Sequence, residues 1–141
     1  RWVDLASRLM PKWPVIMLGG PDDRQRAETL ASHAKGALIN LAGQTRLGQS
    51  AAVIAGAALV IGVDTGLTHM GIALDVPTLA LFGSTRPYLD TGRTNARVLY
   101  SPLDCSPCRR RPTCDDRFDC MRQHTPDSVL AAASELLGCP L

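Results

Sequence analysis

The sequence predicts an α/β fold with a Rossmann-like, doubly wound parallel sheet. Short apolar runs alternate strictly with helical patterns through the first four runs, which favours parallel strands joined by right-handed crossovers. The run at residues 59–63 shows no polar alternation, as expected for a strand that is covered on both faces. A chain of 141 residues is long enough to bury the core of one domain. We therefore expect one domain over residues 1–141.

The first third of the chain contains two predicted helices. Trp2, Leu5 and Leu9 fall at helical spacing and predict a helix at the start. After the first strand, Asp22 or Asp23 is placed to cap the next helix. The expected strands are residues 15–18, 38–41, 59–63, 78–82 and 98–100. The expected later helices are residues 22–35, 47–57, 66–74 and 126–137.

Two of these helices have informative apolar patterns. The helix at 47–57 is rich in alanine and apolar nearly all round, so we expect it to be buried. Residues 84–97 and 101–125 have the composition of loops. The last helix places five apolar side chains on one face: Val129, Leu130, Ala133, Leu136 and Leu137.

Bulk properties exclude some classes of partner. The net charge of +2 gives no case for nucleic acid as a main partner. No apolar run reaches the roughly 18 residues that a transmembrane helix needs. The chain opens on Arg1 and Trp2 without a methionine or a signal sequence, and we expect it to be a segment of a longer protein.

The ligand site can be placed from the fold class. In open parallel sheets, ligands bind outside the carboxyl ends of the strands. The segments that meet this rule are residues 19–23, 42–45 and 64–69, with residues 83–86 as a fourth.

Residues 64–69 have the pattern of an anion site. A buried strand ends there, Gly66 permits close approach, and the first amides of a helix point outward with its positive dipole end. We expect Thr65 and Thr68 to add hydroxyl donors and His69 to donate to a phosphate or a sugar hydroxyl. Asp64 would cap the helix or accept hydrogen bonds from sugar hydroxyls. The alternative is that Asp64 or Thr65 is only a helix cap and His69 an ordinary surface residue.

The run Asp-Thr-Gly-Leu-Thr-His at residues 64–69 resembles the motif of glycosyltransferase family 9, the ADP-heptose:lipopolysaccharide heptosyltransferases. The similarity continues through further segments, at residues 19–23, 41–47, 73–78 and 81–85. Six motif residues in this strand–turn–helix context are a specific signal. The resemblance implies the C-terminal, nucleotide-sugar-binding half of a GT-B enzyme, with an N-terminal acceptor domain absent from this chain.

The resemblance also implies roles for individual residues. The matched donor-binding residues are Asp64, Thr65, Gly66, Leu67, Thr68 and His69. Asp23 matches an acidic position that binds the ribose hydroxyls, and Thr45 a position beside the adenine; a helix cap and a turn residue are the respective alternatives. Arg86 stands where the family often has aspartate, which changes the contacts expected of that loop.

The implied activity is transfer of a sugar, heptose from ADP-heptose, to a lipopolysaccharide-type acceptor. The catalytic base would lie in the N-terminal domain, so we assign no catalytic residue here. The nucleotide-sugar donor is the expected substrate and no cofactor is required. The location implied is cytoplasmic, with peripheral association at the inner face of the bacterial inner membrane. The alternatives are a non-catalytic nucleotide-binding or metal-knuckle module, and half of a sugar-nucleotide epimerase.

Four cysteines cluster before the last helix, at Cys105, Cys108, Cys114 and Cys120. Their thiols could hold zinc, could form disulfides in an exported protein, or could be reduced thiols in a loop. The sequence leaves these three interpretations open. The adjacent arginine-rich loop also contains several aspartates and is interpreted as solvated.

Overall fold

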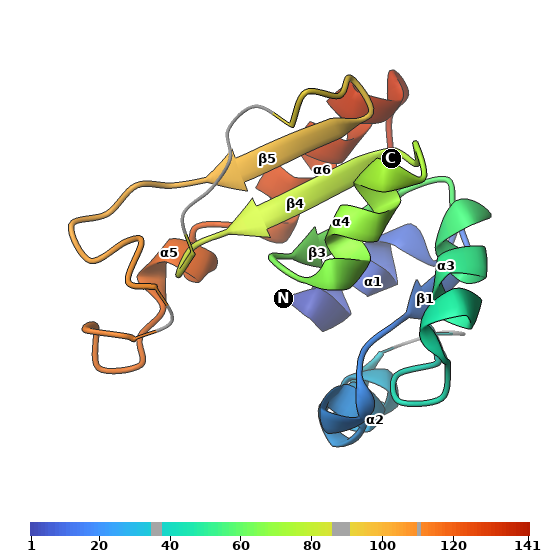
Figure 1. Ribbon diagram of the computed structural model, residues 1–141, viewed down its shortest axis with the longest axis horizontal. Coiled ribbons are helices and arrows are strands. Elements are labelled where there is room, and N and C mark those ends of the chain that lie inside the picture. The colour runs from blue at the N-terminus through green and yellow to red at the C-terminus, as the bar shows by residue number, and fades with distance from the viewer. Residues whose placement is uncertain (35–37, 86–90, 110) are drawn as a thin grey trace.

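The computed structural model describes residues 1–34, 38–85, 91–109 and 111–141. Every strand pair among them is parallel (Figure 1). The strands are β1 Val15–Met17, β2 Leu38–Asn40, β3 Val60–Val63, β4 Thr78–Phe82 and β5 Ala96–Tyr100. The helices are α1 Trp2–Leu9, α2 Arg24–His33, α3 Leu47–Ala55, α4 Gly66–Ala73, α5 Asp119–Arg122 and α6 Pro126–Leu137, with a 3-10 turn, η1, at Pro21–Asp23. The predicted α/β class is confirmed.

The hydrogen-bonded strands form two sheets where we predicted one. β1 pairs with β2, and β4 lies between β3 and β5 in a second sheet. β1 and β2 are three residues long, so each contributes few ladder bonds. Two further backbone bonds extend their pairing, from Leu41 N–H to the Met17 carbonyl (2.9 Å) and from Gly43 N–H to the Gly19 carbonyl (3.0 Å). The loops that follow β1 and β2 are therefore joined.

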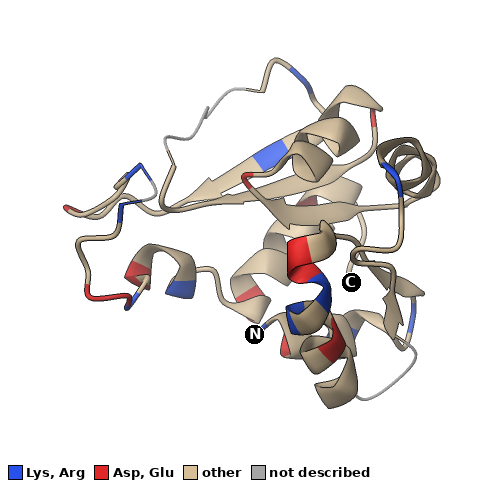
Figure 2. Ribbon diagram, turned by 60° about the horizontal axis from the view of Figure 1, so that its bottom comes forward, with Lys and Arg blue, Asp and Glu red and all other residues tan. Residues whose placement is uncertain are grey.

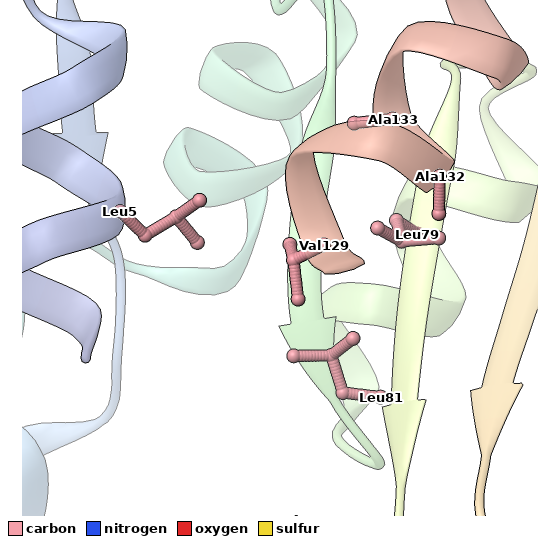
Figure 3. Close-up of a cluster of buried hydrophobic side chains, with 6 residues drawn as sticks. All are labelled: Leu5, Leu79, Leu81, Val129, Ala132 and Ala133. Atoms are coloured by element: carbon pink, nitrogen blue, oxygen red, sulfur yellow. The ribbon is translucent and has the colours of Figure 1, made fainter. Parts of the chain in front are cut away.

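The core lies on one face of the larger sheet, where α1 and α6 cover it (Figures 1 and 3). Leu79 and Leu81 of β4 point to this face because residues two apart in a strand share a face. They pack with four helical residues: Leu5, Val129, Ala132 and Ala133. All of β4 is buried, whereas β3, the strand that we predicted to be covered on both faces, is only partly buried.

The last helix has the predicted bounds, and its ends explain them. Thr125 accepts a hydrogen bond from the Ser128 amide at 3.2 Å, which caps the first turn. Gly138 ends the helix in the left-handed region, with φ of 66°. Both signals are local in sequence.

The opposite face of the sheet is covered by α4, with α3 beside it (Figure 1). Gly71 brings α4 close, because a Cβ there would lie 2.6 Å from Thr78 Oγ1 and 3.2 Å from Val60 Cγ2. The prediction that the helix at 47–57 is buried was wrong: only Ser50 and Ile54 are buried, and Leu47 is 71% exposed. The helix uses one face against its neighbours, so apolar composition does not imply burial on every side.

The start of α2 differs from the prediction. A 3-10 turn occupies Pro21–Asp23, and the α-helix begins at Arg24. The Asp23 side chain does not cap α2; its Oδ2 accepts the Gly20 amide at 2.9 Å. The predicted end of this helix, Lys35, lies outside the described residues.

The surface carries interspersed charges of both signs (Figure 2). Arg8 of α1 bonds to Asp4 on the same helix and to Asp127 of α6. Such exposed pairs contribute little to stability, although this one links the first and last helices. Among the described residues, no helix is both long enough and apolar enough to span a membrane.

Candidate functional site

A hollow of about 370 Å³ lies where β3 and β4 end. Its position is the one that open parallel sheets use for ligands. It is lined by Val63, Asp64, Thr65, Leu81, Gly83, Ser84, Thr85 and Met121. Two of the four predicted segments, the one after β3 and the one after β4, thus meet at one site.

The N-terminus of α4 begins beside this hollow. Thr65 is its N-cap residue, with extended φ and ψ of −139° and 161°, and the Thr65 side chain makes no capping hydrogen bond. The amides of Gly66, Leu67 and Thr68 have no intrahelical acceptor at the start of a helix. A Cβ built on Gly66 meets nothing within 4 Å, so the space beside the first residue of the helix is open. The arrangement suits an anion.

Asp64 and His69 lie together at the edge of the hollow. His69 Nε2 is 3.1 Å from Asp64 Oδ1, with side-chain exposures of 46% and 24%. The two side chains orient each other, and both stay accessible to a ligand. Neither interpretation of Asp64 from the sequence included this pairing.

The two threonine hydroxyls of the motif bond to the protein. Thr68 is 2% exposed, and its hydroxyl donates to the Val63 carbonyl at 2.6 Å. Thr65 Oγ1 lies 3.3 Å from Thr68 Oγ1. A hydroxyl has one proton to donate, so Thr65 is the donor in this contact. The structure therefore does not support the expectation that the Thr68 hydroxyl donates to a ligand.

Sequence reasoning missed Gly62 and Met121. A Cβ on Gly62 would lie 2.2 Å from Thr68 Oγ1, so the glycine makes room for that hydroxyl. A glycine inside a strand pattern is a known signal of close approach, and it was present in the sequence. Met121 lines the hollow from α5, and no local pattern indicates that contact.

The two other predicted segments, residues 19–23 and 42–45, are adjacent after β1 and β2. Gly43 has φ of 67°, which only glycine adopts readily, and its amide bonds to Gly19. A Cβ on Gly19 would lie 2.9 Å from Asp23 Oδ2, so this turn needs a glycine beside the aspartate. A second hollow, of about 490 Å³, is lined by Asp22, Asp23, Gln25, Arg26 and Thr29.

Asp23 and Thr45 are not among the described residues that line the hollow at β3 and β4. Thr45 Oγ1 bonds to Ser50 Oγ at 2.8 Å and ties its turn to α3. Their assignments to ribose and adenine remain predictions. Arg86, the departure from the family pattern, lies outside the described residues.

The loop from Ser101 to His124 packs against the end of β4. Ser106 Oγ donates to the Gly83 carbonyl at 2.5 Å, and the buried His124 Nε2 lies 2.8 Å from the Phe82 carbonyl. In Figure 1, α5 accordingly lies at the tip of β4. The loop thereby forms one wall of the hollow through Met121.

The cysteines in this loop are free thiols in the structure. Within the described ranges, no three His, Cys, Asp or Glu side chains form a group that could hold a metal ion. Burial raises the pKa of the Cys120 thiol, and the nearby Cys105, Cys108 and Cys114 act in the same direction. In this structure the cysteines are not paired in disulfides. The zinc interpretation of the cluster stays a prediction.

Comparison with known proteins gives these features a family context. A family model described as glycosyltransferase family 9 (heptosyltransferase) matches residues 1–118. Lipopolysaccharide heptosyltransferase 1 of Pseudomonas aeruginosa is 38% identical over 136 residues, which cover 86% of this chain and 37% of that protein.

Solved structures agree. ADP-heptose lps heptosyltransferase II of E. coli superposes with a TM-score of 0.81 at 25% identity, over 96% of this chain and 40% of that one. E. coli heptosyltransferase WaaC with ADP-2-deoxy-2-fluoro heptose gives 0.70 at 28% identity, over 95% and 36%. The chain thus spans about two fifths of the length of these relatives. None of these three relatives, the Pseudomonas aeruginosa protein and the two solved structures, is an epimerase or a non-catalytic module.

Proposed function

The chain belongs to glycosyltransferase family 9, and from this premise we propose that it is the donor-binding part of a heptosyltransferase. The donor is a nucleotide diphosphate sugar, ADP-heptose in the first instance, and the acceptor is a lipopolysaccharide-type saccharide. The acceptor site and the catalytic base belong to a further domain of the longer protein. The enzyme would act in the cytoplasm, with peripheral association at the inner membrane.

One observation carries the proposal: the uncapped N-terminus of α4 opens beside a hollow at the carboxyl ends of β3 and β4. A diphosphate placed there would receive the amides of Gly66, Leu67 and Thr68. The same amides would stabilise the negative charge that builds on the diphosphate as it leaves the sugar. The site would therefore contribute to binding and also to the transition state.

The side chains around this terminus have separate proposed roles. Asp64 would accept hydrogen bonds from sugar hydroxyls, and His69, which bonds to it, would hold its carboxylate in place or donate to the ligand. Asp23 would bind the ribose hydroxyls, and Thr45 would lie beside the base. The family membership supports these roles, and substitutions of Asp64 and Asp23 test two of them.

Calorimetric titration of the purified protein with ADP, UDP and GDP tests the proposal. We expect ADP to bind weakly, yet more tightly than UDP or GDP, because the base and ribose contacts are assigned to an adenine nucleotide. Absence of binding for all three nucleotides, in protein shown to be folded by circular dichroism, would contradict the proposed function. Stronger binding of UDP than of ADP would be consistent with the proposed binding site but would contradict ADP-heptose as the donor.

Replacing Asp64 with asparagine should distinguish the contribution of the sugar to binding from that of the diphosphate. Asp64→Asn removes a charge and keeps an oxygen acceptor, so ADP affinity should hardly change. The intact nucleotide sugar should bind more weakly, by roughly 0.5–1.5 kcal/mol for the weakened hydrogen bonds. The measurement is the dissociation constant of ADP and that of the intact nucleotide sugar, each for the variant and for the unmodified protein. An equal loss for both ligands would remove the assignment of Asp64 to the sugar.

A further inference from the structure

We infer that Thr68 is a positioning residue: its buried hydroxyl holds the strand-to-helix turn in the shape that presents the α4 amides. This inference rests on the proposed function for its ligand, ADP. The evidence for it is a contact between a strand glycine and a helix threonine.

The contact is closely fitted. The Thr68 hydroxyl donates to the Val63 carbonyl at 2.6 Å and lies so close to Gly62 that a Cβ there would be 2.2 Å away. Thr68 is only 2% exposed, so water cannot readily replace this bond. The bond links the last residue of β3 to the first turn of α4.

This bond closes a ring over residues 63–68, which contains the whole turn. Within the ring, the Thr65 hydroxyl lies 3.3 Å from the Thr68 hydroxyl. The Thr65 carbonyl accepts a hydrogen bond from the His69 amide at 3.2 Å. The amide directions of Gly66 and Leu67 therefore depend on the Thr68 hydroxyl. Without it, the turn gains freedom that a ligand must remove on binding, and affinity falls.

A second glycine–threonine contact lies at the other end of the same helix. There the glycine is on the helix and the threonine on the strand: a Cβ on Gly71 would lie 2.6 Å from Thr78 Oγ1. Thr78 is fully buried and donates to the Val76 carbonyl at 2.7 Å. The chemistry matches that of Thr68, but the contact lies away from the ligand end. Thr78 is therefore a matched control.

The experiment compares Thr68→Val, Thr68→Ser and Thr78→Val in the purified protein. Both valine variants lose a buried hydroxyl and should melt at lower temperature. Only Thr68→Val should weaken ADP binding, by about three- to tenfold, the effect of one lost neutral hydrogen bond. Thr68→Ser keeps the hydroxyl and should bind ADP within about twofold of the unmodified protein.

A second measurement does not depend on a ligand. Amide hydrogen exchange at His69 should accelerate in nucleotide-free Thr68→Val and stay unchanged in Thr78→Val, because the His69 amide bonds to Thr65 within the first turn. Unchanged exchange at His69 in folded Thr68→Val would overturn the inference. So would ADP affinity that Thr68→Val leaves intact, or that Thr78→Val lowers equally. If the unmodified protein binds no nucleotide, the proposed function fails, while the exchange result still decides the role of Thr68.

Discussion

Replacing Gly66 with valine is expected to abolish ADP binding and to leave the fold intact. Gly66 is the first residue of α4, where a diphosphate would approach the backbone. A side chain at this point would occupy the space of the phosphate. We expect the dissociation constant to rise by at least about a hundredfold, since about 2.8 kcal/mol or more of binding energy would be lost.

The structure indicates that this substitution can be made without disturbing the fold. A Cβ on Gly66 meets no atom within 4 Å, and its φ is not in the left-handed region, so valine can be accommodated without strain. Loss of binding would then come from the ligand side and not from a damaged turn. Strain in the turn is therefore not an alternative explanation for a loss of binding.

Gly56→Val is the matched control. Gly56 follows the carboxyl end of α3 and is not among the described residues that line the hollow, and a Cβ there has only ordinary contacts of 3.8 Å. This variant should bind ADP as the unmodified protein does. Circular dichroism and melting curves establish that both variants are folded. ADP affinity that is unchanged in folded Gly66→Val would place the diphosphate elsewhere and refute the central proposal.

Replacing Asp23 with alanine is expected to weaken ADP binding by roughly 1.5–3 kcal/mol, because a ribose hydroxyl would lose a charge-assisted acceptor. That loss corresponds to about 10- to 150-fold in the dissociation constant. The structure adds a complication: Asp23 also accepts the Gly20 amide at 2.9 Å, so its removal affects the turn. Titration of a single variant is therefore not sufficient.

Two further variants separate the ligand from the turn. Asp23→Asn keeps an oxygen that can accept the Gly20 amide and loses only the charge. Its ADP affinity should still be lower than that of the unmodified protein. Asp22→Ala removes a neighbouring carboxylate with the same change in net charge and should bind ADP normally. Recovery of binding in Asp23→Asn would mean that Asp23 serves the turn alone. An equal loss in Asp22→Ala would indicate a general effect of charge.

Much of the fold is predictable because its signals are local. The bounds of α6 follow from Thr125 before its first turn and Gly138 after its last. β4 was predicted with its observed bounds from a short, mostly apolar run. The break between the two sheets was not predictable, because it depends on how β1 and β3 lie in space.

The same distinction holds within the candidate site. The sequence by itself identified the family and the position of the proposed anion site, since the motif at 64–69 is contiguous and ligands bind at the carboxyl ends of the strands in this fold. Only the tertiary structure decided what the side chains do. It directed the Thr68 hydroxyl inward to Val63, paired His69 with Asp64, and brought Met121 to the hollow. These outcomes depend on distances between atoms of separate elements, which the local order of residues does not specify.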